Sequence, residues 1–124
     1  MRKPSSPSVK ITYFDKERVR RALDSYVAAL VVEHPEIERV VLFGSMARGG
    51  TVPGSNVDLL LVLSSSDHPF LDRVPLYTPD RFPVGIDVFP YTQTEIRAML
   101  DEGNFFVRRA LGEGVTLFER NHPA

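Results

Sequence analysis

The sequence predicts an α/β or α+β fold, a sheet of about four strands with helices packed against it. Apolar runs of strand length alternate along the chain with segments of helical periodicity. Two of these runs, Val40–Phe43 and Val57–Leu63, are almost continuously apolar, which is typical of interior strands that are buried on both faces. Stretches rich in Gly, Pro and Ser separate the periodic segments and indicate turns and loops.

Length and composition favour a single globular domain. The chain has 124 residues, a formal net charge of −1 and no cysteine, so disulfides and thiolate metal sites are excluded. We expect a flexible N-terminal tail over residues 1–12 and one domain over residues 13–121. Nucleic acid is not an expected partner, because no basic stripe is present. The sequence shows no membrane-spanning run and no hydrophobic signal region, which favours a cytoplasmic protein.

The first half of the chain predicts one helix and two strands. Val19, Leu23 and Val27 recur at helical spacing, which predicts a helix that begins with Asp15 as N-cap and ends near His34-Pro35. Strands are expected over Ile37–Phe43 and Val57–Leu63.

The second half predicts a long connection and then a strand, two helices and a last strand. The connection spans Ser64–Pro83 and holds four prolines, with a short helix expected around Phe70–Val74. A strand is expected over Val84–Phe89, ended by Pro90, and a capping box of Thr92 and Glu95 then starts a helix that runs to about Gly103. Asn104 caps a further helix over Phe105–Leu111, which Gly112 ends. The last expected element is a strand over Val115–Phe118.

The junction after the first strand is predicted to bind phosphate. Gly44 allows a tight turn and a close approach of backbone to ligand. Ser45 follows where a helix would begin, so unpaired N–H groups and a hydroxyl would face an anion. Arg48 falls on the same side three residues later and is either a phosphate ligand or a solvated arginine.

The second and third strands carry candidate metal ligands. Asn56 and Asp58 are two residues apart, so both point to one face of a strand. Asp58 and Asp87 each interrupt an apolar strand, where an unpaired carboxylate is unfavourable. If the two strands are neighbours, these side chains can share a cation; an exposed edge position would explain either residue alone.

These residues resemble a pattern of the DNA polymerase β superfamily of nucleotidyltransferases, in particular the minimal nucleotidyltransferases. The family pattern is Gly-Ser, ten residues, Asp-x-Asp, and a third Asp on a later strand. Here Gly44-Ser45 is followed by ten residues and then by Asn56-Val57-Asp58. Asp87 corresponds to the third carboxylate, and the family's first Asp is an asparagine in this chain.

The resemblance implies a mixed sheet flanked by helices and transfer of a nucleoside monophosphate, with AMP from ATP as the first choice, to an acceptor hydroxyl. It implies Mg²⁺ held by Asp58, Asp87 and Asn56, and triphosphate held by Gly44, Ser45 and Arg48. Because Asn56 brings no charge, a catalytically degenerate nucleotide- or partner-binding module remains the alternative. Small relatives are often paired with an α-helical HEPN toxin as its antitoxin, so such a partner is expected; a homo-oligomer also stays open.

Overall fold

The computed structural model describes residues 13–44, 46–47 and 57–121. The tail expected over residues 1–12 lies outside these residues. The elements, in chain order, are α1 (Tyr13–Glu33), β1 (Ile37–Phe43), β2 (Val57–Leu63), α2 (Phe70–Tyr77), β3 (Ile86–Thr92), α3 (Gln93–Asp101), α4 (Phe105–Glu113) and β4 (Val115–Glu119). No helix in the described ranges combines the length and the apolar character that crossing a membrane requires.

The described strands form one mixed sheet in the order β3-β2-β1-β4. The interior strand β1 is antiparallel to both β2 and β4, whereas β2, the other interior strand, is parallel to β3. The parallel pair needs a crossover connection, and α2 lies in it. The sequence-based expectation of a four-stranded mixed sheet flanked by helices is therefore confirmed.

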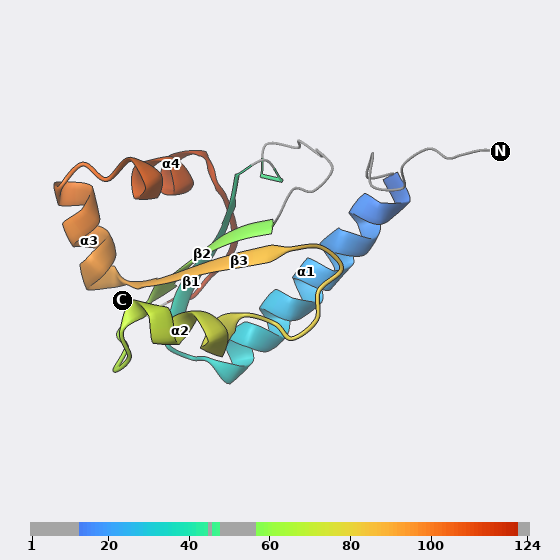
Figure 1. Cartoon of the computed structure of the whole chain (residues 1–124), viewed down its shortest axis with the longest axis horizontal. Helices are drawn as coiled ribbons and strands as arrows, with labels where there is room; N and C mark the ends of the chain where they lie inside the picture. Colours follow the sequence, from blue (N-terminus) through green and yellow to red (C-terminus); the bar gives the residue numbers. More distant parts are fainter. Residues whose placement is uncertain (1–12, 45, 48–56, 122–124) are drawn as a thin grey trace.

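Helices cover both faces of the sheet, with α1 on one side and α3 and α4 on the other (Figure 1). Alternate residues of β2 divide between the two faces. Leu59 and Leu61 pack in the core that contains the apolar side of α1, whereas Leu60 packs with Ile96 of α3 and Val107 of α4. The near-continuous apolar character of β2 follows from this burial on both faces, as the sequence predicted.

Several local predictions match the structure. Strands β1 and β2 have the expected bounds. The capping box is formed, since the Glu95 N–H donates to Thr92 Oγ1 at 3.1 Å and the Thr92 N–H donates to Glu95 Oε1 at 2.9 Å. Asn104 caps α4 through its side chain, which accepts from the Val107 N–H at 3.0 Å.

Two predicted element boundaries near the first and second helices were wrong. Helix α1 already includes Tyr13, so Asp15 lies inside the helix and is not its N-cap. Helix α2 continues past Val74 to Tyr77 despite Pro75 within it. The buried Tyr77 side chain, 4% exposed, packs in the core on the α1 face, so tertiary packing outweighs the local proline signal.

Two further boundaries were wrong in the last third of the chain. Strand β3 runs from Ile86 to Thr92 and includes Pro90; β3 is an edge strand, where a missing ladder N–H is tolerated. Helix α4 passes through Gly112 and its C-cap is Gly114. A Cβ on Gly114 would lie 2.3 Å from the Ala110 carbonyl oxygen and 2.4 Å from Val41 Cγ1, so glycine is required there by close packing.

Candidate active site

Three side chains lie in a row across neighbouring strands at one end of the sheet. Phe43, the last residue of β1, is the register partner of Asp58 on β2, and Asp58 is the register partner of Asp87 on β3. The Val57 N–H donates to the Gly85 carbonyl oxygen at 2.8 Å and joins the starts of β2 and β3. The structure thus places the two predicted carboxylates on adjacent strands, directly beside each other.

Both carboxylates emerge on the sheet face that carries α3 and α4. Asp58 alternates with Val57 and Leu59, which belong to the core on the α1 side. Asp87 shares its face with Phe89, which packs against the α3 and α4 core. Asp58 is half-buried and Asp87 is exposed, so a ligand can reach the pair from one side.

Gly44 brings the turn after β1 into contact with Asp58. Its φ is +80°, in the left-handed region that favours glycine. A Cβ on Gly44 would lie 2.6 Å from Asp58 Oδ2. Sequence reasoning expected this glycine to admit a ligand; the structure shows that it also leaves room for the Asp58 carboxylate.

The turn itself differs in part from the expectation. The Ala47 N–H donates to the Gly44 carbonyl oxygen at 3.2 Å, and Met46 and Ala47 lie in a turn and not in a helix. Ser45, Arg48 and Asn56 lie outside the described residues, so their roles stay predictions from the sequence.

The carboxylate pair is electrostatically unfavourable without a cation. Burial raises the pKa of Asp58 above its usual value, and the nearby Asp87 carboxylate raises this pKa further. Hard oxygen donors of this kind suit Mg²⁺, and a divalent cation between them would offset the repulsion. Within the described part of the chain, no group of three or more His, Asp or Glu side chains is arranged to hold a metal. Further ligands would therefore come from elsewhere, such as substrate phosphates or water.

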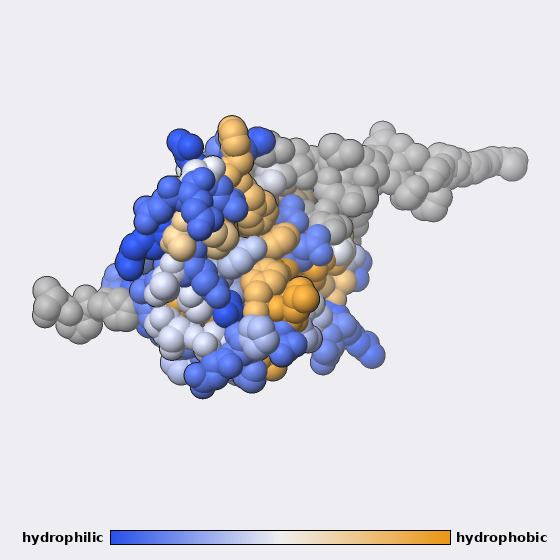
Figure 2. Space-filling view, turned by 60° about the vertical axis from the view of Figure 1, so that its left-hand side comes forward, coloured by the Kyte–Doolittle hydropathy of each residue, from blue (hydrophilic) through white to orange (hydrophobic). Residues whose placement is uncertain are grey.

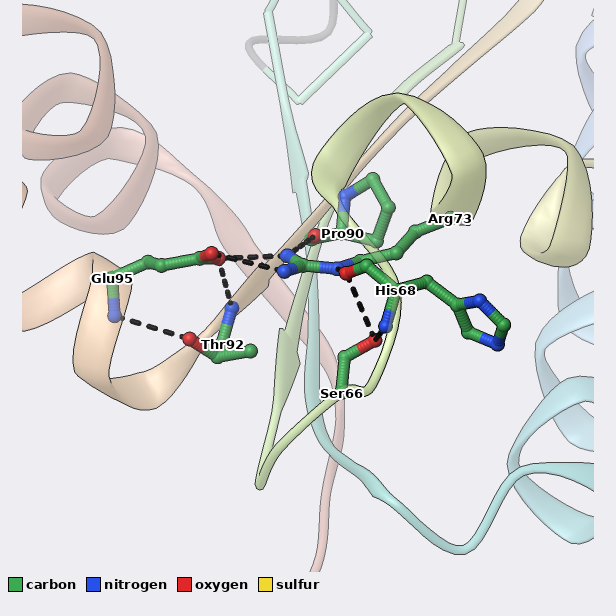
Figure 3. A network of polar contacts seen from close by, with 6 residues as sticks. All are labelled: Ser66, His68, Arg73, Pro90, Thr92 and Glu95. Carbon is green, nitrogen blue, oxygen red and sulfur yellow. Dashed lines mark hydrogen bonds and ion pairs between the residues drawn. The ribbon is translucent and has the colours of Figure 1, made fainter.

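A buried arginine that sequence reasoning missed fixes the strand that carries Asp87 (Figure 3). The Arg73 side chain on α2 is 5% exposed. Its Nη1 donates to the Pro90 carbonyl oxygen at 3.0 Å and to Glu95 Oε1 at 2.7 Å, and its Nη2 donates to Glu95 Oε2 at 3.0 Å. Its Nε donates to the His68 carbonyl oxygen at 2.7 Å. One guanidinium thus joins α2, β3 and the start of α3.

This network is a charge-assisted, bidentate ion pair, which is geometrically specific. The Arg73 guanidinium lowers the pKa of Glu95 to about 2. The sequence does carry a signal for this role: Arg73 lies three residues after Phe70 and four before Tyr77, so the three side chains share one side of the helix. These two neighbours pack inward, so the same side of the helix directs Arg73 toward the sheet.

Comparison with known proteins decides the family. A sequence profile described as "Polymerase beta, Nucleotidyltransferase" matches residues 26–123. The chain belongs to this family. A crystal structure of a "putative nucleotidyltransferase" from Sulfolobus solfataricus is similar, with a TM-score of 0.58 and 20% sequence identity over 85% of this chain and 84% of that one. At this identity the similarity supports the nucleotidyltransferase fold and nothing finer. No curated protein matches this nucleotidyltransferase-family chain significantly.

Proposed function

We propose that this chain transfers a nucleoside monophosphate, AMP from ATP as the first choice, to an acceptor hydroxyl in the presence of Mg²⁺. The observation that carries the proposal is the register pairing of Asp58 with Asp87 beside the Gly44 turn. Burial and the neighbouring Asp87 carboxylate raise the pKa of Asp58, which supports the proposal because a carboxylate perturbed by a like charge is a candidate for a functional group.

The chain's own residues would divide the work as follows. Asp58 and Asp87 would hold Mg²⁺, which supplies neutralisation of the phosphate charge when it is bound. Gly44 would let the triphosphate approach the backbone, with Ser45 and Arg48 as further phosphate ligands on sequence grounds.

Transfer would form one bond and break one bond. The acceptor oxygen would bond to the α-phosphorus, the bond between the α-phosphorus and the bridging oxygen would break, and pyrophosphate would leave with the electron pair. The exposed Asp87 is the described group best placed to take the hydroxyl proton. The main contributions of the protein would be positioning and charge neutralisation.

A second function is favoured by Asn56, which stands where the family pattern has its first Asp. A chain without that charge would bind nucleotide or a protein partner and transfer nothing. A loss of about 3 to 4 kcal/mol in transition-state stabilisation lowers a rate several-hundredfold. The loss of one metal-binding charge could therefore turn an active transferase into a chain that only binds.

For the acceptor, we propose a hydroxyl on a helical protein of the HEPN class, with this chain acting as its antitoxin. The support is the resemblance to the minimal nucleotidyltransferases of HEPN pairs. The formal net charge of −1 also makes a nucleic-acid acceptor less favourable than a protein.

The test is transfer of label from α-³²P-ATP to a co-expressed HEPN protein, measured for the natural chain and for Asn56→Asp with Mg²⁺ present. The proposal expects labelled partner and released pyrophosphate in equal amounts, with a rate that rises about a hundredfold or more in Asn56→Asp. Asp87→Asn in the same background serves as the inactive control. If Asn56→Asp binds MgATP and the HEPN protein but transfers no label, the binding module is the correct account.

A further inference from the structure

A cavity of about 440 Å³ opens beside the row of Phe43, Asp58 and Asp87, at its Phe43 end. It is lined by Phe43 and Gly44 at the end of β1 and by Phe105, Phe106 and Arg109 on α4, with Ala110 and Glu113. This volume falls in the range of pockets that bind small molecules. Its lining is aromatic on one side and charged at the rim.

The aromatic side of the cavity is a preformed cluster. The Phe106 ring meets the Phe43 ring edge-on at 5.3 Å between centroids, and it lies 5.0 Å from the Phe89 ring. Phe105 is nonetheless 76% exposed and Phe106 is 38% exposed. On the face of the molecule drawn in Figure 2, apolar surface lies between hydrophilic regions. Exposed aromatic faces next to a polar site suit a flat ring that can stack on them.

The charged rim offers both kinds of hydrogen-bonding group. Arg109 Nη2 lies 3.5 Å from Glu113 Oε1, and both side chains are more than half exposed. An exposed pair of this length contributes little to stability and can rearrange around a ligand. The rim therefore presents donors and an acceptor, as the edge of a nucleobase requires.

The position of the cavity identifies which part of a nucleotide it would take. Gly44 lines the cavity and also touches Asp58, so the cavity is continuous with the predicted phosphate turn. A second cavity of about 410 Å³ lies on the other side of the row, where Asp87 and Phe89 line it together with α2. The two carboxylates thus lie between two cavities, and the phosphate turn borders the first.

We propose that the cavity of Phe43, Phe105, Phe106 and Arg109 binds the nucleobase of the donor triphosphate. The base stacks on the phenylalanine rings and its edge meets the Arg109 and Glu113 rim. This leaves the second cavity, beside Asp87, open to the acceptor. The inference rests on the proposed function, because it takes the donor to be a nucleoside triphosphate.

The test compares MgATP with magnesium tripolyphosphate, which has the phosphates and no base, by isothermal titration calorimetry. Phe105→Ala is the main variant, since this side chain is largely exposed and its loss leaves the core intact. Phe106→Leu is the second variant. Leu71→Ala, which removes another exposed apolar side chain from α2, is the matched control.

MgATP should bind the natural chain more tightly than tripolyphosphate does. Phe105→Ala and Phe106→Leu should each weaken MgATP about tenfold, in line with the contribution of one stacked base, and leave tripolyphosphate within about twofold. Leu71→Ala should change neither ligand. Equal weakening of both ligands by the phenylalanine variants would overturn the inference, because it would place the effect at the phosphates.

Failure of the inference and failure of the proposed function give different results. If MgATP affinity survives both phenylalanine variants and is lost in Asp58→Ala, the base binds elsewhere while the carboxylate site stands. If neither MgATP nor tripolyphosphate binds the natural chain, the proposed function fails, and the base site fails with it.

Discussion

Replacing Asp58 with asparagine should stabilise the metal-free protein. Asp58 and Asp87 are register partners on neighbouring parallel strands, so their side chains leave the sheet about 5 Å apart. Asparagine keeps the size of aspartate and removes one of the two charges. The change therefore removes the burial of the Asp58 charge and the repulsion between the two carboxylates, the two causes that raise the Asp58 pKa.

The magnitude follows from the separation of the carboxylates and their exposure. Two like charges about 5 Å apart repel by about 3 kcal/mol at an effective dielectric constant of about 20. Asp87 is exposed, so solvent and salt screening reduce this repulsion to about 1 kcal/mol. Relief of the Asp58 burial penalty adds a similar amount. We expect Asp58→Asn to raise the free energy of unfolding by about 1 to 2 kcal/mol, a rise of roughly 3 to 8 °C in Tm.

The pH dependence has a definite sign. The folded-state pKa of Asp58 lies above its usual 3.8. Between 3.8 and the raised value, the folded protein binds more protons than the unfolded chain does, so stability falls as pH rises through that window. The full penalty is present at about pH 7. The advantage of Asp58→Asn should therefore be largest near pH 7 and should vanish below about pH 4.

Thermal unfolding in EDTA and in excess Mg²⁺ tests this reasoning. In EDTA, the Tm of the Asp58→Asn variant is compared with the Tm of the natural chain. Asp80→Asn, which neutralises an exposed carboxylate in the connection between α2 and β3, is the matched control and should change Tm little. Mg²⁺ should stabilise the natural chain more than it stabilises Asp58→Asn. An Asp58→Asn protein that is less stable than the natural chain in EDTA at neutral pH would refute the account of the pair.

Three further predictions concern the residues that shape the site. Gly44→Ala should destabilise the protein by about 2 to 4 kcal/mol in urea unfolding, because its φ is +80° and its Cβ would meet Asp58 Oδ2; an unchanged midpoint would contradict the described turn. Arg73→Met should lower stability by about 2 kcal/mol, since it leaves the Glu95 carboxylate without its guanidinium; Arg97→Met, on an exposed position of α3, is the control and should be neutral. Stability at low pH should also fall in the natural chain. The Glu95 pKa is lowered from 4.5 to about 2, so its contribution is complete above about pH 4.5 and is lost as pH falls toward 2. Because the Glu95 side chain is 39% exposed, we expect this contribution to the free energy of unfolding to be about 1 to 2 kcal/mol. Between about pH 5 and pH 2, the Glu95→Gln variant should therefore lose less stability than the natural chain.

The parts of the fold that sequence predicted well are those that local chemistry determines. The bounds of β1 and β2 follow from apolar runs ended by glycine and polar residues, and the capping box of Thr92 and Glu95 follows from two side chains three residues apart. The boundaries that failed depend on distant neighbours. Pro90 ends a strand by local rules, yet β3 continues through it because, among the described strands, none lies on its outer side in the sheet.

The same division applies to the site. Sequence spacing selected Gly44, Asp58 and Asp87, and the sheet register places the two carboxylates together. Arg73 was missed because its role depends on Pro90 and Glu95, which are 17 and 22 residues away in the sequence. They contact Arg73 only because the chain folds back from α2 into β3 and α3. The aromatic cavity was missed for a related reason. Phe43 and Phe106 are typical core residues by composition, and only the packing of α4 against β1 brings their rings together at the edge of a cavity.

Asp58 and its neighbours are proposed to bind a magnesium-bound triphosphate. Calorimetric titration of ATP into the natural chain and into Asp58→Ala, each with and without Mg²⁺, tests this binding. We expect binding that requires both Mg²⁺ and Asp58. Absence of ATP binding under every condition, in a chain that is folded by circular dichroism, would contradict it and would leave the fold serving as a surface for a protein partner.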